Sequence, residues 1–322
     1  MTRIIDIHRH LWGYDWFPPS HLPKFSAEPI AKRTGRTVEQ VLERIKQSPT
    51  MDATGKVAID EMEHYGIDVS IIQVLDWGLA YGPDEDNQVP AEEFNRLAQE
   101  VCKQYPGKLY AMASYDPRRP KAVALFEQAV KEWGAVGLKM YPPNGYQAND
   151  ERCLPMYAKA AELDVPVLIH TGGNIWAWPE WVELVARQFP DLRIIMGHTN
   201  LQAPFETKAY WQGLQAGARH NNIWLDLCDW QALGAVKEEN IPELLKVIRI
   251  FLNTKGPERI LWGTDLPQAG VGSRARAQTE TWTDIFKNLP EWGKKYDIHF
   301  TEEERDGICF KGAEAAYSNI KF

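Results

Sequence analysis

Eight short apolar segments alternate with longer stretches of helical periodicity along the 322 residues of this chain. The segments are continuous apolar runs, which are typical of strands buried on both faces of a parallel sheet. Eight strand–helix units predict a closed (β/α)8 barrel, the TIM barrel, as a single domain over residues 1–322. The predicted strands are Arg3–Ile7, Val69–Leu75, Lys108–Ser114, Ala135–Tyr141, Pro166–His170, Leu192–His198, Asn222–Leu227 and Arg259–Asp265.

The segment that follows the first predicted strand, to about Lys56, is expected to be an extended loop with a helical part around TVEQVLERIKQ. A doubly wound open sheet is the alternative architecture. Such a sheet usually carries a glycine-rich phosphate loop after its first strand, and HRHLWG is not one. The pattern therefore favours the barrel.

Composition and charge argue against several classes of function. Hydrophobic residues make up 44% of the chain, the net charge is −8 and Lys and Arg form no long run, which argues against nucleic acid or a membrane surface as partner. No window of 18 apolar residues occurs, and the N-terminus lacks the apolar core of a signal peptide. Cys102, Cys153, Cys228 and Cys309 are scattered without a CxxC pair. We therefore expect reduced thiols, a cytoplasmic location and a small-molecule partner.

Polar residues follow several of the predicted strands at their carboxyl ends, where the active sites of such barrels lie. His8 and His10 are two residues apart and would share one face of the first strand. His170, His198 and Asp265 occupy the ends of three further strands. Each residue alone has an ordinary interpretation as a surface or packing histidine or a helix cap. Together, at one mouth, they predict a metal centre.

Three imidazoles and one carboxylate suit Zn²⁺, with Mn²⁺, Fe²⁺ and Co²⁺ as alternatives, and leave a coordination position for water. A bound metal would lower the pKa of that water to about 7. Asp265 is placed to accept its proton, and His198 to orient the water or to polarise the substrate.

The stretches IIDIHRH, GLKMYPP, VLIHTGG, RIIMGHTN and ILWGTDLP, in this order between Ile4 and Pro267, resemble the amidohydrolase superfamily. They are most similar to its amidohydrolase-related branch, amidohydrolase 2, which includes aminocarboxymuconate semialdehyde decarboxylase, aromatic-acid decarboxylases, hydratases and hydrolases. The resemblance implies His8, His10, His170 and Asp265 as ligands of one metal. It also implies His198 as the catalytic histidine and makes a homo-oligomer an expectation.

Lys139 lies on the fourth predicted strand. In binuclear members of the superfamily a carboxylated lysine from this strand bridges two metals, so a second metal is the alternative. We expect one metal, with Lys139 binding an anionic substrate group or an acidic neighbour. The other candidate substrate residues are Arg274, Trp12, Tyr141 and Trp176, for which a solvated loop or ordinary packing is the alternative.

The residues at the strand ends are compatible with three functions. The first is a metal-dependent hydrolase that attacks a lactone, amide or related carbonyl of a small cyclic or aromatic carboxylate. The second is a non-oxidative decarboxylase or hydratase on the same barrel. Retention of His8, where several aromatic-acid decarboxylases of the branch carry Glu, favours hydrolysis. A non-enzymatic barrel would predict a missing ligand, and none is missing.

Overall fold

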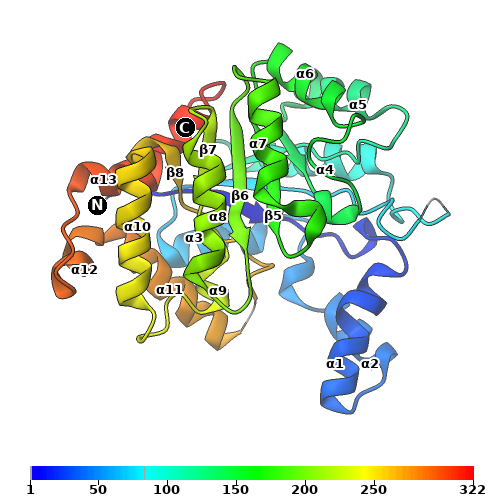
Figure 1. Cartoon of the computed structure of the whole chain (residues 1–322). Helices are drawn as coiled ribbons and strands as arrows, with labels where there is room; N and C mark the ends of the chain where they lie inside the picture. Colours follow the sequence, from blue (N-terminus) through cyan, green and yellow to red (C-terminus); the bar gives the residue numbers. More distant parts are fainter. Residues whose placement is uncertain (1, 83, 271) are drawn as a thin grey trace.

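The computed structural model describes every residue except Met1, Pro83 and Val271, and it confirms the predicted barrel (Figure 1). The described residues form eight strands, and all strand pairings are parallel. The strands are β1 Ile5–His10, β2 Val69–Gln73, β3 Leu109–Met112, β4 Leu138–Met140, β5 Val167–Gly172, β6 Ile194–Leu201, β7 Ile223–Asp226 and β8 Ile260–Leu261.

Backbone hydrogen bonds join these strands into a ring. Strands β1 to β3 and β4 to β8 are each paired in chain order. The Lys139 amide donates to the Ala113 carbonyl and links β4 to β3 at 2.7 Å. The His10 amide donates to the Leu266 carbonyl at 2.7 Å, which attaches the segment after β8 to β1. The ring therefore closes on both sides.

Helices alternate with the strands and cover the outside of the barrel, as the α7, α8 and α10 ribbons show (Figure 1). No helix in the described part of the chain has the length and apolar character needed to cross a membrane. The helices are α1 Glu28–Thr34, α2 Val38–Lys46, α3 Lys56–Tyr65, α4 Ala91–Gln104, α5 Ala122–Gln128, α6 Leu154–Glu162, α7 Pro179–Gln188, α8 Thr207–Ala218, α9 Trp230–Leu233, α10 Ile241–Lys255, α11 Ser273–Lys287, α12 Leu289–Lys295, α13 Glu302–Asp306 and α14 Gly312–Ala316.

The predicted extended loop after β1 contains α1 and α2, which project from the barrel (Figure 1). Helix α2 begins with a capping box, in which the Thr37 hydroxyl accepts from the Gln40 amide and the Gln40 side chain accepts from the Thr37 amide. Before α1 lies the short helix η2, Leu22–Ala27. The chain just before and within η2 brings His21 and Phe25 to the carboxyl end of the barrel.

An irregularity in β1 turns two consecutive residues toward the barrel axis. Ile7 packs in the inner cluster with Val69 and Leu168. His8, the next residue, also points inward, because its ring contacts Lys139 on β4 and Asp226 on β7. The β1–β2 register shifts between Asp6 and Arg9, which permits this arrangement. Regular alternation would have sent one of the two side chains outward.

The end of β5 depends on a glycine that approaches β6 closely. Gly172 has φ +92°, and a Cβ there would fall on the backbone nitrogen and carbonyl oxygen of Leu201. Gly173 has φ +81° but nothing near the position of a Cβ. Gly172→Ala should therefore lower the free energy of unfolding by about 2–4 kcal/mol, through clash as well as strain. Gly173→Ala should cost about 1 kcal/mol, from strain alone.

Urea denaturation of the two variants measures this difference. The same backbone region is changed in both, so Gly173→Ala controls for the left-handed conformation. Equal losses of stability would contradict the close approach of β5 and β6 at Leu201.

Candidate metal centre

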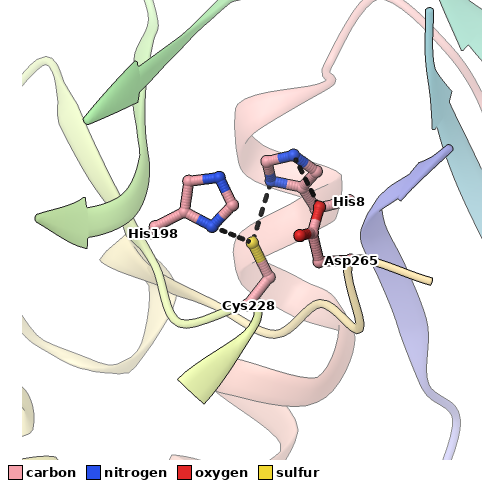
Figure 2. A group of neighbouring side chains, drawn as sticks. All are labelled: His8, His198, Cys228 and Asp265. Atoms are coloured by element: carbon pink, nitrogen blue, oxygen red, sulfur yellow. Dashed lines mark hydrogen bonds and ion pairs between the residues drawn. The ribbon is translucent and has the colours of Figure 1, made fainter. Parts of the chain in front are cut away.

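Three of the predicted ligands meet at the carboxyl end of β1 and the segment after β8. The His10 Nε2 atom lies 2.9 Å from Asp265 Oδ1, and the His8 Nε2 atom lies 3.5 Å from the same oxygen. All three side chains are buried. Figure 2 shows the Asp265 carboxylate facing the His8 ring. Asp265 has φ +57°, and its amide donates to the His8 carbonyl at 2.7 Å, so the backbone itself holds the carboxylate against β1.

Hydrogen bonds behind the two imidazoles determine which ring nitrogens face Asp265 without a proton. His10 Nδ1 lies 2.7 Å from the Gln73 carbonyl oxygen, which can only accept, so Nδ1 carries the hydrogen. His8 Nδ1 lies 2.6 Å from the Asp226 carboxylate and donates to it in the same way. In the neutral rings each Nε2 is then an acceptor directed toward Asp265.

The pKa shifts agree with neutral imidazoles. Burial, with Lys139 as the next cause, lowers the pKa of His10 to about 3. Burial, with Lys139 again second, lowers the pKa of His8 well below its ordinary value. Burial raises the pKa of Asp265, against the opposing effect of Lys139. Two nitrogen acceptors and a carboxylate that converge among buried side chains fit a divalent cation, which would satisfy all three.

Lys139 supplies a positive charge at this point. Its Nζ atom donates to His8 Nε2 at 3.0 Å, and the side chain is fully buried on β4. Burial lowers its pKa, while the Asp265 charge opposes the shift. The sequence predicted an anionic substrate group or an acidic neighbour for Lys139, and the structure places its ammonium against the His8 imidazole. The ammonium occupies the side of His8 from which a metal would be bound.

His198 and Cys228 lie on the opposite side of the His8 ring from Asp265 (Figure 2). The Cys228 Sγ atom is 3.0 Å from His8 Nδ1 and 3.1 Å from His198 Nδ1. Burial, with the Asp226 charge second, raises the pKa of Cys228 well above its ordinary value, so the group is a thiol. The potential ligand atoms of Cys228, His8, His198 and Asp265 lie within 4.8 Å of one another.

Cys228 nevertheless contacts the protonated edge of His8, because His8 Nδ1 donates to Asp226. The thiol is also 3.0 Å from Asp226 Oδ2. This geometry favours a supporting role in which Asp226 and Cys228 orient the two rings. Both were missed by sequence reasoning, although polar residues at the end of an apolar strand, in NIWLDLCDW, were a signal at the seventh strand.

A left-handed backbone run positions His198. His198, Thr199 and Asn200 have φ values of +61°, +48° and +72°. The Trp230 indole donates to the His198 carbonyl at 2.9 Å, and the Asn200 amide donates to the Thr171 hydroxyl at 2.7 Å. Residues rarely adopt this conformation without support, and it turns His198 into the mouth of the barrel.

A cavity of about 450 Å³ opens over this cluster. His170 lines it and lies beside His198, with 4.5 Å between the ring centroids. Burial lowers the pKa of His170 well below its ordinary value. The structure thus brings His170 to the same mouth, on the His198 side. A second cavity, of about 650 Å³ between α3 and α11, is lined by none of the predicted site residues.

The predicted substrate residues separate into two groups. Trp12 and Tyr141 line the cavity together with Lys139, and Trp12 stacks on His10 with 4.5 Å between ring centroids. Trp176 and Arg274 are exposed and are not among the described residues that line it. Trp176 lies in the short helix after β5, and Arg274 in the first turn of α11.

His21 also lines the cavity, which its place in the extended loop did not require. Its ring stacks with Phe17 and Phe25 at centroid distances of 5.0 and 5.2 Å. Its Nδ1 atom is 3.1 Å from the Tyr81 hydroxyl. The packing of the extended loop onto the β2–α4 loop buries this residue.

The buried His21 should make the stability of the protein sensitive to acid. Burial lowers the pKa of His21 from 6.5 to about 4, so between these values the unfolded chain binds more protons than the folded protein. The free energy of unfolding should therefore fall as the pH drops from 6.5 toward 4, by about 3 kcal/mol for this group. His21→Gln should remove this contribution.

Urea midpoints of wild type and His21→Gln at pH 7 and pH 4.5 measure the effect, and the other histidines cancel in the difference. His299 is exposed, so His299→Gln should keep the wild-type response. A parallel pH response of His21→Gln and wild type would mean that His21 is protonated as readily in the folded state as in the unfolded one.

Comparisons with known proteins place this chain in a family. Residues 5–318 match the sequence profile of the family described as Amidohydrolase. The 2-keto-4-carboxy-3-hexenedioate hydratase of Sphingobium sp. (strain NBRC 103272 / SYK-6) is 24% identical over 350 aligned residues, which cover 97% of this chain and 95% of the hydratase.

Two solved structures share the fold over nearly their whole length. A probable 2-pyrone-4,6-dicarboxylic acid hydrolase from Acinetobacter baumannii has a TM-score of 0.61 and 16% identity, covering 98% of this chain and 100% of that one. A 5-carboxyvanillate decarboxylase from Novosphingobium aromaticivorans, in complex with manganese, has a TM-score of 0.61 and 14% identity, covering 98% and 96%. The chain therefore belongs to the amidohydrolase family, in the amidohydrolase-related branch that the strand-end motifs indicated.

Proposed function

We propose that this protein is a metal-dependent hydrolase that adds water to a carbonyl of a small cyclic or aromatic carboxylate. The observation that carries the proposal is the convergence of His8 Nε2 and His10 Nε2 on Asp265 Oδ1, with both Nδ1 hydrogens committed elsewhere. These three residues, with His170 as the fourth, would hold one divalent metal. Zinc suits this set best, and manganese, iron and cobalt are the alternatives. When bound, the metal supplies a Lewis acid that activates water and polarises a carbonyl.

The side chains of this chain supply the proton transfers. Asp265 is buried, and its raised pKa suits a group that takes a proton from attacking water and holds it for the leaving atom. His198 faces the cavity from the other side, where its ring can donate to the substrate oxygen on which charge develops. Trp12 and Tyr141 provide apolar walls that orient a ring and exclude bulk water.

A hydratase or decarboxylase is the second candidate, favoured by the whole-length similarity to the Sphingobium hydratase. The same Asp265 would then deliver its proton to a carbon atom of the substrate. The two reactions differ in the bond that breaks, and the cavity residues are compatible with both.

Two measurements test the proposal. Protein stripped with a chelator should lose activity and regain it with about one equivalent of Zn²⁺ or Mn²⁺ per chain. Two equivalents would instead implicate carboxylated Lys139 as a bridge. A panel of aryl and alkyl lactones should release acid without CO2. Release of CO2 from hydroxybenzoates, or loss of the absorbance of an unsaturated diacid, would identify a lyase. A protein that binds neither metal contradicts both candidates.

A further inference from the structure

The positive charge of the cavity is concentrated at one end. Among the described residues that line it, Lys139 is the one Lys or Arg. Its ammonium lies 3.0 Å from His8 Nε2, at the base of the cavity where the metal would bind. Lys24 lies outside the lining, with its Nζ atom 5.5 Å from the centroid of the Tyr81 ring. Among the described lining residues, a substrate anion therefore meets a Lys or Arg side chain at the Lys139 end alone.

Aromatic rings line the rest of the cavity. Trp77 and Tyr141 meet edge to face, with 4.8 Å between their ring centroids, and continue the surface that Trp12 begins. Further rings belong to Phe25 and Tyr81. Such walls favour a flat, apolar ring and contribute no charge to it.

The arginines behind this wall are committed to ion pairs. Arg118 binds the Asp116 carboxylate at 2.6 Å, and Arg119 binds the Asp76 carboxylate at 2.6 Å. Arg118 also donates to the carbonyl of Asn144, a residue of the cavity lining, at 3.1 Å. The guanidinium groups thus hold the wall in place from outside and leave no fork for a substrate carboxylate.

The wall also contributes an acidic group. Asp229 lines the cavity, is nine-tenths buried and has φ +67°. Its Oδ1 atom has no hydrogen-bond partner among the described residues. An acidic side chain at this position provides no cation for a second carboxylate.

We propose that the cavity selects a ring substrate with a single carboxylate, held at the Lys139 end, and rejects a substrate with a second one. The inference rests on the proposed function for the identity of the reacting end. A second carboxylate would lie against aromatic rings or Asp229, and an unpaired charge buried in such surroundings is strongly unfavourable. The selectivity differs from that suggested by the three similar proteins described above, whose names denote substrates with two or more carboxylates.

Isothermal titration of the zinc-loaded protein with matched ligands tests the proposal. Benzoate carries one charge, isophthalate and terephthalate carry two, and their monomethyl esters keep the size of the diacids with one charge. Benzoate and both half-esters should bind with similar affinity, and both diacids at least tenfold more weakly. A diacid that binds as tightly as benzoate would overturn the proposal, and half-esters as weak as the diacids would show that size decides.

A variant pair separates charge from general effects. Gln268 lines the cavity near its exposed edge, so Gln268→Arg should raise diacid affinity at least fivefold relative to benzoate. Gln104 is exposed at the end of α4, and Gln104→Arg should change neither the affinity for the diacids nor the affinity for benzoate. An unchanged selectivity in Gln268→Arg would count against charge as its cause. Failure of benzoate to bind also overturns the proposal. The zinc content of the same sample is measured, so that this failure can be told apart from loss of the metal site.

Discussion

Replacing Asp265 by asparagine should lower kcat/KM at least ~10³-fold while leaving the fold intact. Asparagine has nearly the same shape as aspartate and tolerates the left-handed backbone of this position. The main-chain N–H of residue 265 can therefore still donate to the His8 carbonyl. The variant removes the negative oxygen that faces His8 Nε2 and His10 Nε2, and with it the group that would accept a proton. Steady-state kinetics, circular dichroism and metal content together measure the effect.

Asp297 provides a matched control for this substitution. It has φ +55°, close to the +57° of Asp265, but it is exposed in the turn after α12. Asp297→Asn should therefore show wild-type kinetics. Near-normal turnover by Asp265→Asn, with the fold preserved, would remove this residue from the catalytic assignment.

Replacing Asp226 by asparagine should weaken metal binding by about 10- to 100-fold. Asp226 accepts from His8 Nδ1 at 2.6 Å and so directs the lone pair of Nε2 toward Asp265. The same carboxylate accepts from the His198 amide at 3.2 Å and the Cys228 amide at 2.9 Å. An amide at this position removes the charge and can turn its NH2 group toward His8, which favours the wrong tautomer of the ring. Competition with a fluorescent zinc chelator measures the affinity.

Cys228→Ala is the comparison that distinguishes support from ligation. The thiol contacts Nδ1 of both histidines, so its loss should cost less metal affinity than Asp226→Asn. A larger loss in Cys228→Ala would identify the sulfur as a ligand, as the close grouping of Cys228 with His8, His198 and Asp265 allows.

Much of the fold follows from local patterns in the sequence. Each predicted strand contains a strand of the structure or overlaps it, because a strand buried on both faces must be apolar throughout. The observed strand boundaries differ from the predicted ones where tertiary hydrogen bonds extend or end a strand. Strand β1 continues to His10 because it pairs with Gln73 of β2, and β8 ends at Leu261, before the turn that presents Asp265.

The sequence predicted the position of those site residues that barrel topology places at the strand ends. It did not predict the position of residues that depend on how the loops pack. His8, His10, His170, His198 and Asp265 all reach one mouth, since parallel strands end on the same side of the sheet. Arg274 and Trp176 also follow strands, but their loops carry them outward to solvent. Loop direction depends on contacts distant in sequence, which no local pattern records.

The sequence by itself determined the barrel, its family and the residue types at the strand ends, because strand periodicity and topology are local and repetitive. The tertiary structure alone decided which atoms of those residues face one another. The bulge in β1 turns His8 inward beside Ile7, and Asp226 and Gln73 select the ring nitrogens that remain free. It also buried His21 in the cavity wall and left Lys139 as the one Lys or Arg among the described lining residues. These outcomes arise from side chains that meet across the barrel, where distance in space is unrelated to distance along the chain.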